Sequence, residues 1–206
     1  GEVSAHELMR RADIAMYRAK SSGKNRYCQY AKAIDSERNE EISIADELRS
    51  ILASGTIAVA YQPIVDARTR SIVAVEALAR WPTSSARRIT PDRFVAVAES
   101  QGLIDHLGDA ILSRACADAV HWPDLRLSVN ISPVQLRNPD FVHKTLRTIS
   151  DSGIDIRRIE LEMTEGSLVS DIEGAKQMFK ELQTAGIHIA LDDFGTGFSS
   201  IGYLRQ

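Results

Sequence analysis

The chain has 206 residues, a formal net charge of −3 and 44% hydrophobic residues. This composition is typical of a globular protein with enough chain to bury a core. The near-neutral charge balance gives no support for a partner that is a nucleic-acid polymer. No apolar run approaches the roughly 20 residues that span a bilayer, so we expect a cytoplasmic segment without membrane contact, although a longer protein could be attached elsewhere.

The two ends and the cysteines set further expectations. The sequence begins with Gly1 and ends with Gln206 in the middle of a pattern, so we expect a segment of a longer protein. Cys28 and Cys116 lie far apart without a C-x-x-C pattern. They are expected to be reduced thiols of a cytosolic protein.

The first part of the chain is predicted to be helical. Apolar residues recur on one helical face over residues 5–20, and Gly23 ends this pattern. Residues 25–30 are expected to form a short edge strand. A charged connector follows, and a second helix is predicted from about Ser36 to Gly55.

After Gly55 the hydrophobic period changes to two, which predicts strands over 56–66 and 71–81. Helices are expected over 90–100 and 104–120. Strands and helices then alternate along the rest of the chain: 125–132, 141–153, 158–165, 171–185 and 188–195. Alternation of this kind favours βαβ units and a mostly parallel sheet.

Each predicted strand has one apolar face and one face that becomes polar toward its C-terminal end. The polar positions near the strand ends are Gln62, Glu76, Asn130, Glu162 and Asp192. Strands of a (β/α) barrel show this pattern when their C-terminal rim carries a site. The alternative is that these are structural hydrogen-bonding residues at a barrel mouth, and it stays open for each of them.

The polar positions predict a metal site. Carboxylates and one amide oxygen, without histidine or thiolate, suit hard cations such as Mg²⁺ or Mn²⁺. The adjacent like charges of Asp192 and Asp193 also favour cations beside them, because neighbouring carboxylates otherwise resist ionisation. Two such cations would activate water and stabilise the charge of an attacked phosphodiester.

Three neighbouring features have two interpretations each. Arg80 is in phase with Glu76 and could pair with a phosphate oxygen or form a salt bridge at the rim. Glu165 could ligate a metal or hold the following loop. The segment GTGFSS, residues 195–200, could cradle a phosphate or form an ordinary turn after a strand.

Five motifs in order resemble the EAL domain, the bacterial phosphodiesterase of cyclic di-GMP. They are YQPIVD, VEALARW, SVNISPVQL, IELEMTE and LDDFGTGFSSIGYL, within about residues 42–206. Residues 10–27 resemble the end of a GGDEF domain, which is diguanylate cyclase-like. We therefore expect a GGDEF-like remnant over 1–31, a connecting helix over 32–55 and the N-terminal portion of an EAL barrel over 56–206.

The resemblance implies an α/β fold: a TIM-type barrel with its first strand antiparallel, here with about five of eight strands, preceded by a short helix-strand remnant of an α/β domain. It implies hydrolysis of cyclic di-GMP to linear pGpG by a homodimer. The implied metal ligands are Glu76, Asn130, Glu162, Asp192 and the bridging Asp193. The implied nucleotide contacts are Gln62 and Arg80. Glu165 would hold the loop after the fifth strand, and this loop helps to organise the site and the dimer interface. The implied catalytic residues are Glu76, Asp192, Asp193 and Glu165.

The sequence also departs from the family pattern. The later strands, which carry a Lys-Ile-Asp motif, a Glu-Gly-Val-Glu motif and a glutamine, are absent, and five strands cannot close a barrel of eight. We therefore expect the 206-residue chain by itself to be inactive and the longer protein to be active. The alternatives are an inactive EAL-type receptor for cyclic di-GMP and a scaffold whose barrel another chain completes.

Overall fold

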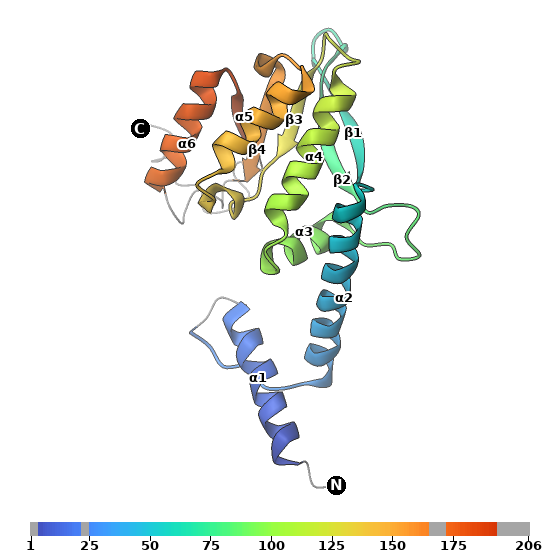
Figure 1. Cartoon of the computed structure of the whole chain (residues 1–206), viewed down its shortest axis with the longest axis vertical. Coiled ribbons are helices and arrows are strands. Elements are labelled where there is room, and N and C mark those ends of the chain that lie inside the picture. Colours follow the sequence, from blue (N-terminus) through green and yellow to red (C-terminus); the bar gives the residue numbers. More distant parts are fainter. Residues whose placement is uncertain (1–3, 22–24, 165–171, 193–206) are drawn as a thin grey trace. The chain divides into compact units, whose positions relative to one another are not determined.

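The computed structural model describes residues 4–21, 25–164 and 172–192. The chain forms two compact units, Gly1–Glu47 and Leu48–Gln206. The boundary lies within helix α2, Lys32–Ser54, which Figure 1 shows as one continuous helix. This helix begins before the predicted start near Ser36. Among the described helices, none combines the length and the apolar character that crossing a bilayer requires.

The first unit contains helix α1, Ala5–Ser21, and the first part of α2. Side chains connect the two helices: Arg10 Nη1 donates to Asp35 Oδ2 at 2.8 Å, and the Arg38 guanidinium lies 5.3 Å from the centre of the Tyr17 ring. Ile14 of α1 is buried. The described part of the unit is therefore a pair of helices, with an irregular segment over residues 25–31 before the second.

The edge strand predicted over residues 25–30 is wrong. This segment is a bend followed by irregular backbone. An extended segment becomes a strand only when a neighbouring strand pairs with its backbone groups, and the described part of the first unit contains no strand. Tyr30 contacts side chains instead: its hydroxyl lies 3.3 Å from Asp35 Oδ2, and the Arg11 guanidinium lies over its ring.

The second unit is built on one five-stranded sheet with strands in chain order. The strands are β1 (Ala58–Val65), β2 (Ile72–Arg80), β3 (Arg126–Asn130), β4 (Ile159–Thr164) and β5 (His188–Asp192). Strands β1 and β2 are antiparallel, and the pairs from β2 to β5 are parallel. An incomplete α/β barrel with an antiparallel first strand is confirmed.

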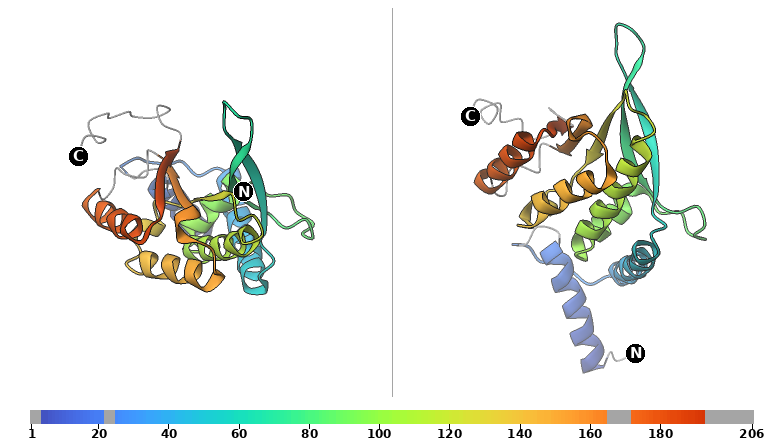
Figure 2. Two further views of the ribbon diagram at one scale, coloured as in Figure 1. Left: turned by 90° about the horizontal axis from the view of Figure 1, so that it is seen from above. Right: turned by 45° about the horizontal axis from the view of Figure 1, so that its top comes forward.

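Four helices accompany this sheet. They are α3 (Pro91–Ser100), α4 (Ile104–Ala119), α5 (Phe141–Ser152) and α6 (Ile172–Ala185), with short 3₁₀ turns η1 (Gln135–Arg137) and η2 (Ile156–Arg158). Helices α4, α5 and α6 lie on one side of the curved sheet (Figure 2). Helix α5 ends at Gly153, whose positive φ of 77° favours glycine at this position.

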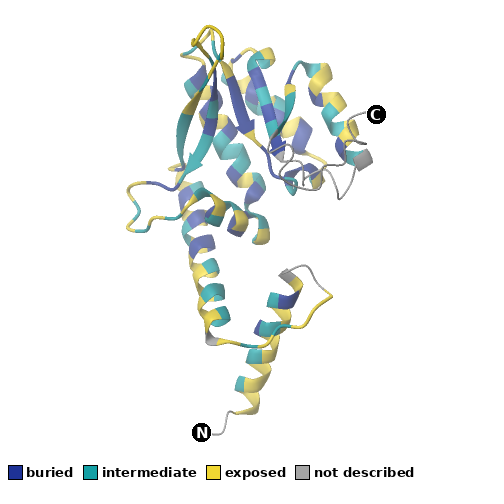
Figure 3. Ribbon diagram, turned by 180° about the vertical axis from the view of Figure 1, so that it is seen from behind, coloured by how far each residue is buried: buried dark blue, intermediate teal, exposed yellow. Residues whose placement is uncertain are grey.

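The hydrophobic core lies between the sheet and these helices. Val75, Leu127, Val129 and Leu161 belong to it, and every second strand residue contributes in this way. The central strands are largely buried, as Figure 3 shows from behind. The opposite face carries the intervening residues, so the predicted separation into an apolar and a polar face is confirmed.

Arg158 connects the helical layer to the start of β4. Its guanidinium donates to the carbonyl oxygens of Ala119 at 3.0 Å, Trp122 at 2.6 Å and Leu125 at 2.8 Å. These carbonyls belong to the end of α4 and the connection to β3. The contact fixes where β4 begins relative to β3, and this in turn decides which side chains are neighbours at the other end of both strands.

Candidate active site

Glu76 and Asn130 meet on the polar face of the sheet. Glu76 lies in β2 and Asn130 ends the neighbouring strand β3. The Asn130 amide donates from Nδ2 to Glu76 Oε1 at 2.7 Å, although 54 residues separate the two in sequence. Because the amide uses its nitrogen in this contact, its carbonyl oxygen can act as a ligand.

Glu162 lies beside Asn130 on the next strand. The two residues are register partners in the parallel pair β3–β4, so their side chains leave the sheet on the same face. The backbone N–H of Ile131 donates to the Glu162 carbonyl oxygen at 2.8 Å, which continues the ladder past Asn130. The structure therefore brings three predicted ligands to adjacent strands.

The two predicted nucleotide contacts belong to β1 and β2. Gln62 is the register partner of Glu76 in the antiparallel pair and is exposed on the same face. Arg80 is the last residue of β2 and is half-buried, and its Nη1 donates to the Ala79 carbonyl oxygen at 2.9 Å. Arg80 thus lies at the edge of the sheet where β3 and β4 also end.

The remaining predicted residues follow β4 and β5. Asp192 ends β5, with its backbone paired to Thr164. The Asp192 side chain and all of Asp193 and Glu165 lie outside the described residues. Among the residues that the structure describes, no group of three histidine, cysteine, aspartate or glutamate side chains gathers closely enough to hold a metal ion.

The described part of the site fits a hard cation in its chemistry. It offers two carboxylates and one amide oxygen on adjacent strands and no nitrogen or sulfur ligand from histidine or cysteine. Mg²⁺ and Mn²⁺ prefer oxygen ligands of this type. Glu76, Asn130 and Glu162 would supply one side of such a site.

Ser128 is a site residue that sequence reasoning did not select. It lies on the polar face between two register partners, Glu76 on β2 and Glu160 on β4. Its exposed fraction is 0%, and its Oγ has no hydrogen-bond partner among the described residues. Alternation placed it on this face, but a serine in a strand carries no signal of burial without a partner.

The loop after β3 is held by its own polar contacts. Ser132 Oγ donates to Glu99 Oε1 at 2.6 Å, and the Ser132 backbone N–H donates to Gln135 Oε1 at 3.0 Å. Gln135 packs against Gly108, where a β-carbon would overlap its amide nitrogen. These contacts join α3, α4 and the loop directly behind Asn130.

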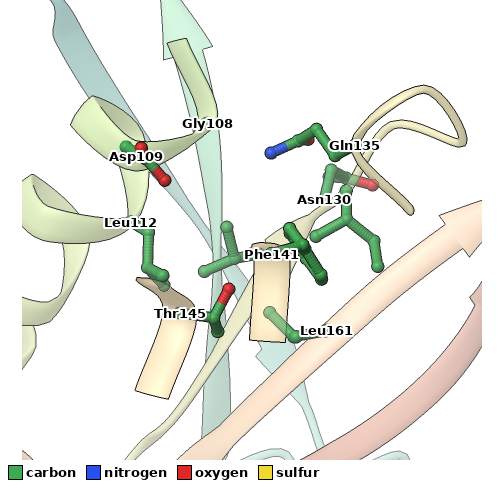
Figure 4. A pocket seen from close by; sticks show the side chains of 10 residues that line it. Gly108, Asp109, Leu112, Asn130, Gln135, Phe141, Thr145 and Leu161 are labelled. Atoms are coloured by element: carbon green, nitrogen blue, oxygen red, sulfur yellow. The ribbon is translucent and has the colours of Figure 1, made fainter. Parts of the chain in front are cut away.

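A small pocket lies on the helix side of β3, next to α4 and α5. The polar ends of Asp109, Gln135 and Thr145 face this space (Figure 4). Burial raises the pKa of the Asp109 carboxyl, and the nearby Lys144 partly offsets that effect. Asn130, which contacts Glu76 on the polar face, also lines this pocket, whereas Glu76 and Glu162 do not.

The fold and the site define an α/β barrel-type domain with an oxygen-donor site at the carboxyl edge of its strands. The EAL domain family matches residues 45–206. The chain belongs to this family.

Individual relatives agree with this assignment. The chain is 41% identical over 205 residues to an uncharacterized protein of Sinorhizobium fredii, covering 99% of this chain and 25% of that protein. It is 33% identical over 206 residues to MucR of Pseudomonas aeruginosa, a bifunctional diguanylate cyclase/cyclic di-GMP phosphodiesterase, covering 98% of this chain and 30% of MucR. The chain therefore spans about a quarter to a third of the curated relatives that it matches.

A solved structure agrees as well. The PaMucR phosphodiesterase in complex with c-di-GMP superposes on the chain with a TM-score of 0.73 and 31% sequence identity. The superposition covers 79% of this chain and 68% of that one.

Proposed function

We propose that the protein to which this chain belongs hydrolyses one phosphodiester bond of cyclic di-GMP to give linear pGpG, with Mg²⁺ or Mn²⁺. The observation that carries this proposal is the contact between Glu76 and Asn130, with Glu162 as the neighbour of Asn130 in register. These side chains come from three strands of an EAL domain. MucR supports the proposed substrate, since it is a cyclic di-GMP phosphodiesterase and its phosphodiesterase structure contains c-di-GMP.

Each residue has a proposed role. Glu76, Asn130 and Glu162 would hold the cations together with Asp192 and Asp193. When bound, the cations supply activation of water and neutralisation of phosphate charge.

The nucleotide is held by side chains on the same face of the sheet. Arg80 pairs with a phosphate oxygen through its planar guanidinium, and Gln62 hydrogen-bonds the nucleotide from its exposed position in β1 beside Glu76. Glu165 holds the loop after β5.

The proposal extends to the rest of the chain. Residues 1–31 are proposed to be the end of a diguanylate cyclase-like GGDEF domain, followed by the connecting helix over 32–55 and the EAL barrel from residue 56. The alignment with a bifunctional cyclase/phosphodiesterase over 98% of the chain supports this division. A homodimer and a cytoplasmic location follow from the family resemblance and belong to the same proposal.

The experiment measures conversion of cyclic di-GMP to pGpG by the full-length protein that carries this sequence, with Mg²⁺, with Mn²⁺ and with EDTA. Glu76→Gln removes a ligating charge and is expected to lower turnover by about 100-fold or more. The matched control is Glu160→Gln. Glu160 lies on the same face of β4, but it pairs with Arg126 at 3.5 Å, and most of the activity should remain.

Two outcomes would contradict the proposal that the protein is a phosphodiesterase with Glu76 in its site. A folded full-length protein that binds cyclic di-GMP without converting it is a receptor. Equal turnover by Glu76→Gln and wild type would remove Glu76 from the site. Solution mass measured alongside tests the homodimer, and a strictly monomeric active protein would contradict it.

A further inference from the structure

Ser128 lies at the centre of the polar face, and its hydroxyl makes no hydrogen bond in the part of the chain that the structure describes. Register places it between Glu76 and Glu160, one pleat before Asn130. The side chain is fully buried, and no described residue accepts or donates a hydrogen bond at its Oγ. Small buried residues in strands are common, but alanine would serve equally well if only packing mattered.

A buried hydroxyl without a partner lowers stability, because it gives up its hydrogen bonds to water and gains none. Native proteins contain few such groups, and each of them calls for an explanation, of which a role in a functional site is one. Ser128 is therefore expected to find its partner in another state of the site.

Two carboxylates lie beside Ser128 in register, and one of them, Glu76, is a proposed metal ligand. Glu160 is already paired with Arg126. Glu76 accepts a hydrogen bond from Asn130 at Oε1. Among the described residues no other side chain hydrogen-bonds Glu76, which leaves its second oxygen open to a further donor.

We propose that Ser128 is a positioning residue that donates to the Glu76 carboxylate when the cation site is loaded. Ligating carboxylates are generally oriented by a second hydrogen bond, and loss of that bond typically weakens metal binding by 10- to 100-fold. Ser128 supplies this bond from the middle of β3, while Asn130 contacts Glu76 from the end of the same strand. The inference rests on the proposed function, because it requires that Glu76 binds a cation.

The test is Ser128→Ala in the full-length protein, with two measurements. Isothermal titration with Mg²⁺ is expected to show a dissociation constant raised about 10-fold. Urea unfolding in EDTA is expected to show an unchanged or higher midpoint, because the variant loses a hydroxyl that the cation-free protein does not satisfy. A merely structural serine gives the opposite pair of results, a lower midpoint and unchanged Mg²⁺ affinity, and that result overturns the proposal.

Ser152→Ala is the matched control. Its hydroxyl donates to the Ile149 carbonyl oxygen at 2.6 Å and accepts from the Ile154 backbone N–H, at the end of α5. This variant should lower the unfolding midpoint and leave Mg²⁺ affinity unchanged. If wild type itself does not bind Mg²⁺, the proposed function and this inference fall together. If wild type binds and Ser128→Ala binds equally well, the inference alone falls.

Discussion

Replacement of Arg158 by methionine tests how the start of β4 is held. Methionine keeps much of the aliphatic packing of arginine and removes the guanidinium. In the wild type this group donates to the carbonyl oxygens of Ala119, Trp122 and Leu125 at 3.0, 2.6 and 2.8 Å. All three carbonyls would lose a charged donor at once.

The expected cost is large for one residue. A hydrogen bond to a charged group contributes about 1.5–3 kcal/mol, and the half-buried position of Arg158 places these bonds at the lower end of that range. Three bonds give about 4–5 kcal/mol, against a total stability of about 5–15 kcal/mol for a domain. With an m-value of about 2 kcal/mol/M, the urea midpoint should fall by about 2 M.

The assay is urea unfolding followed by tryptophan fluorescence, which reports on Trp81 and Trp122, both in the second unit. The control is the neighbouring Arg157→Met. The side chain of Arg157 is 78% exposed, and among the described residues it forms an ion pair with the partly exposed Asp155, so this variant should change the midpoint by a small fraction of that amount. Equal shifts for the two variants would refute the idea that the three carbonyl contacts hold β4.

Two further predictions concern the half-buried Asp109 and the buried Cys116. Because burial raises the pKa of Asp109 in the folded state, its contribution to stability falls as the pH rises. Asp109→Asn should therefore stabilise the protein at pH 7 and much less near pH 4. Equal increases of the urea unfolding midpoint at the two pH values would contradict this. Burial raises the pKa of the fully buried Cys116 to about 11. A thiol reagent at pH 8 should therefore label Cys28 first and Cys116 only after addition of denaturant. Labelling of both cysteines in the folded protein would contradict this and show that α4 opens readily.

The polar face of the sheet was predictable from the sequence because alternation is a local property of a strand. Glu76, Asn130 and Glu162 each fall on the polar phase of their own strand, and the structure confirms that phase for all three. The antiparallel first strand was available only through the family resemblance.

The failed prediction shows the limit of local patterns. Residues 25–30 have suitable residues for a strand, but a strand also needs a partner, and none is found in the described part of the first unit. The sequence of a short segment does not contain the information about what lies beside it.

The amino-acid sequence by itself determined which residues share a face and therefore which chemistry the site can offer. Tertiary structure alone decided that Glu76 and Asn130 touch across 54 residues and that Arg158 contacts three carbonyls before β4. It also decided that Ser128 is buried between two carboxylates, with no hydrogen-bond partner in the part of the chain that the structure describes. The physical reason is that alternation depends on one strand, whereas register and burial depend on which strands and helices pack together.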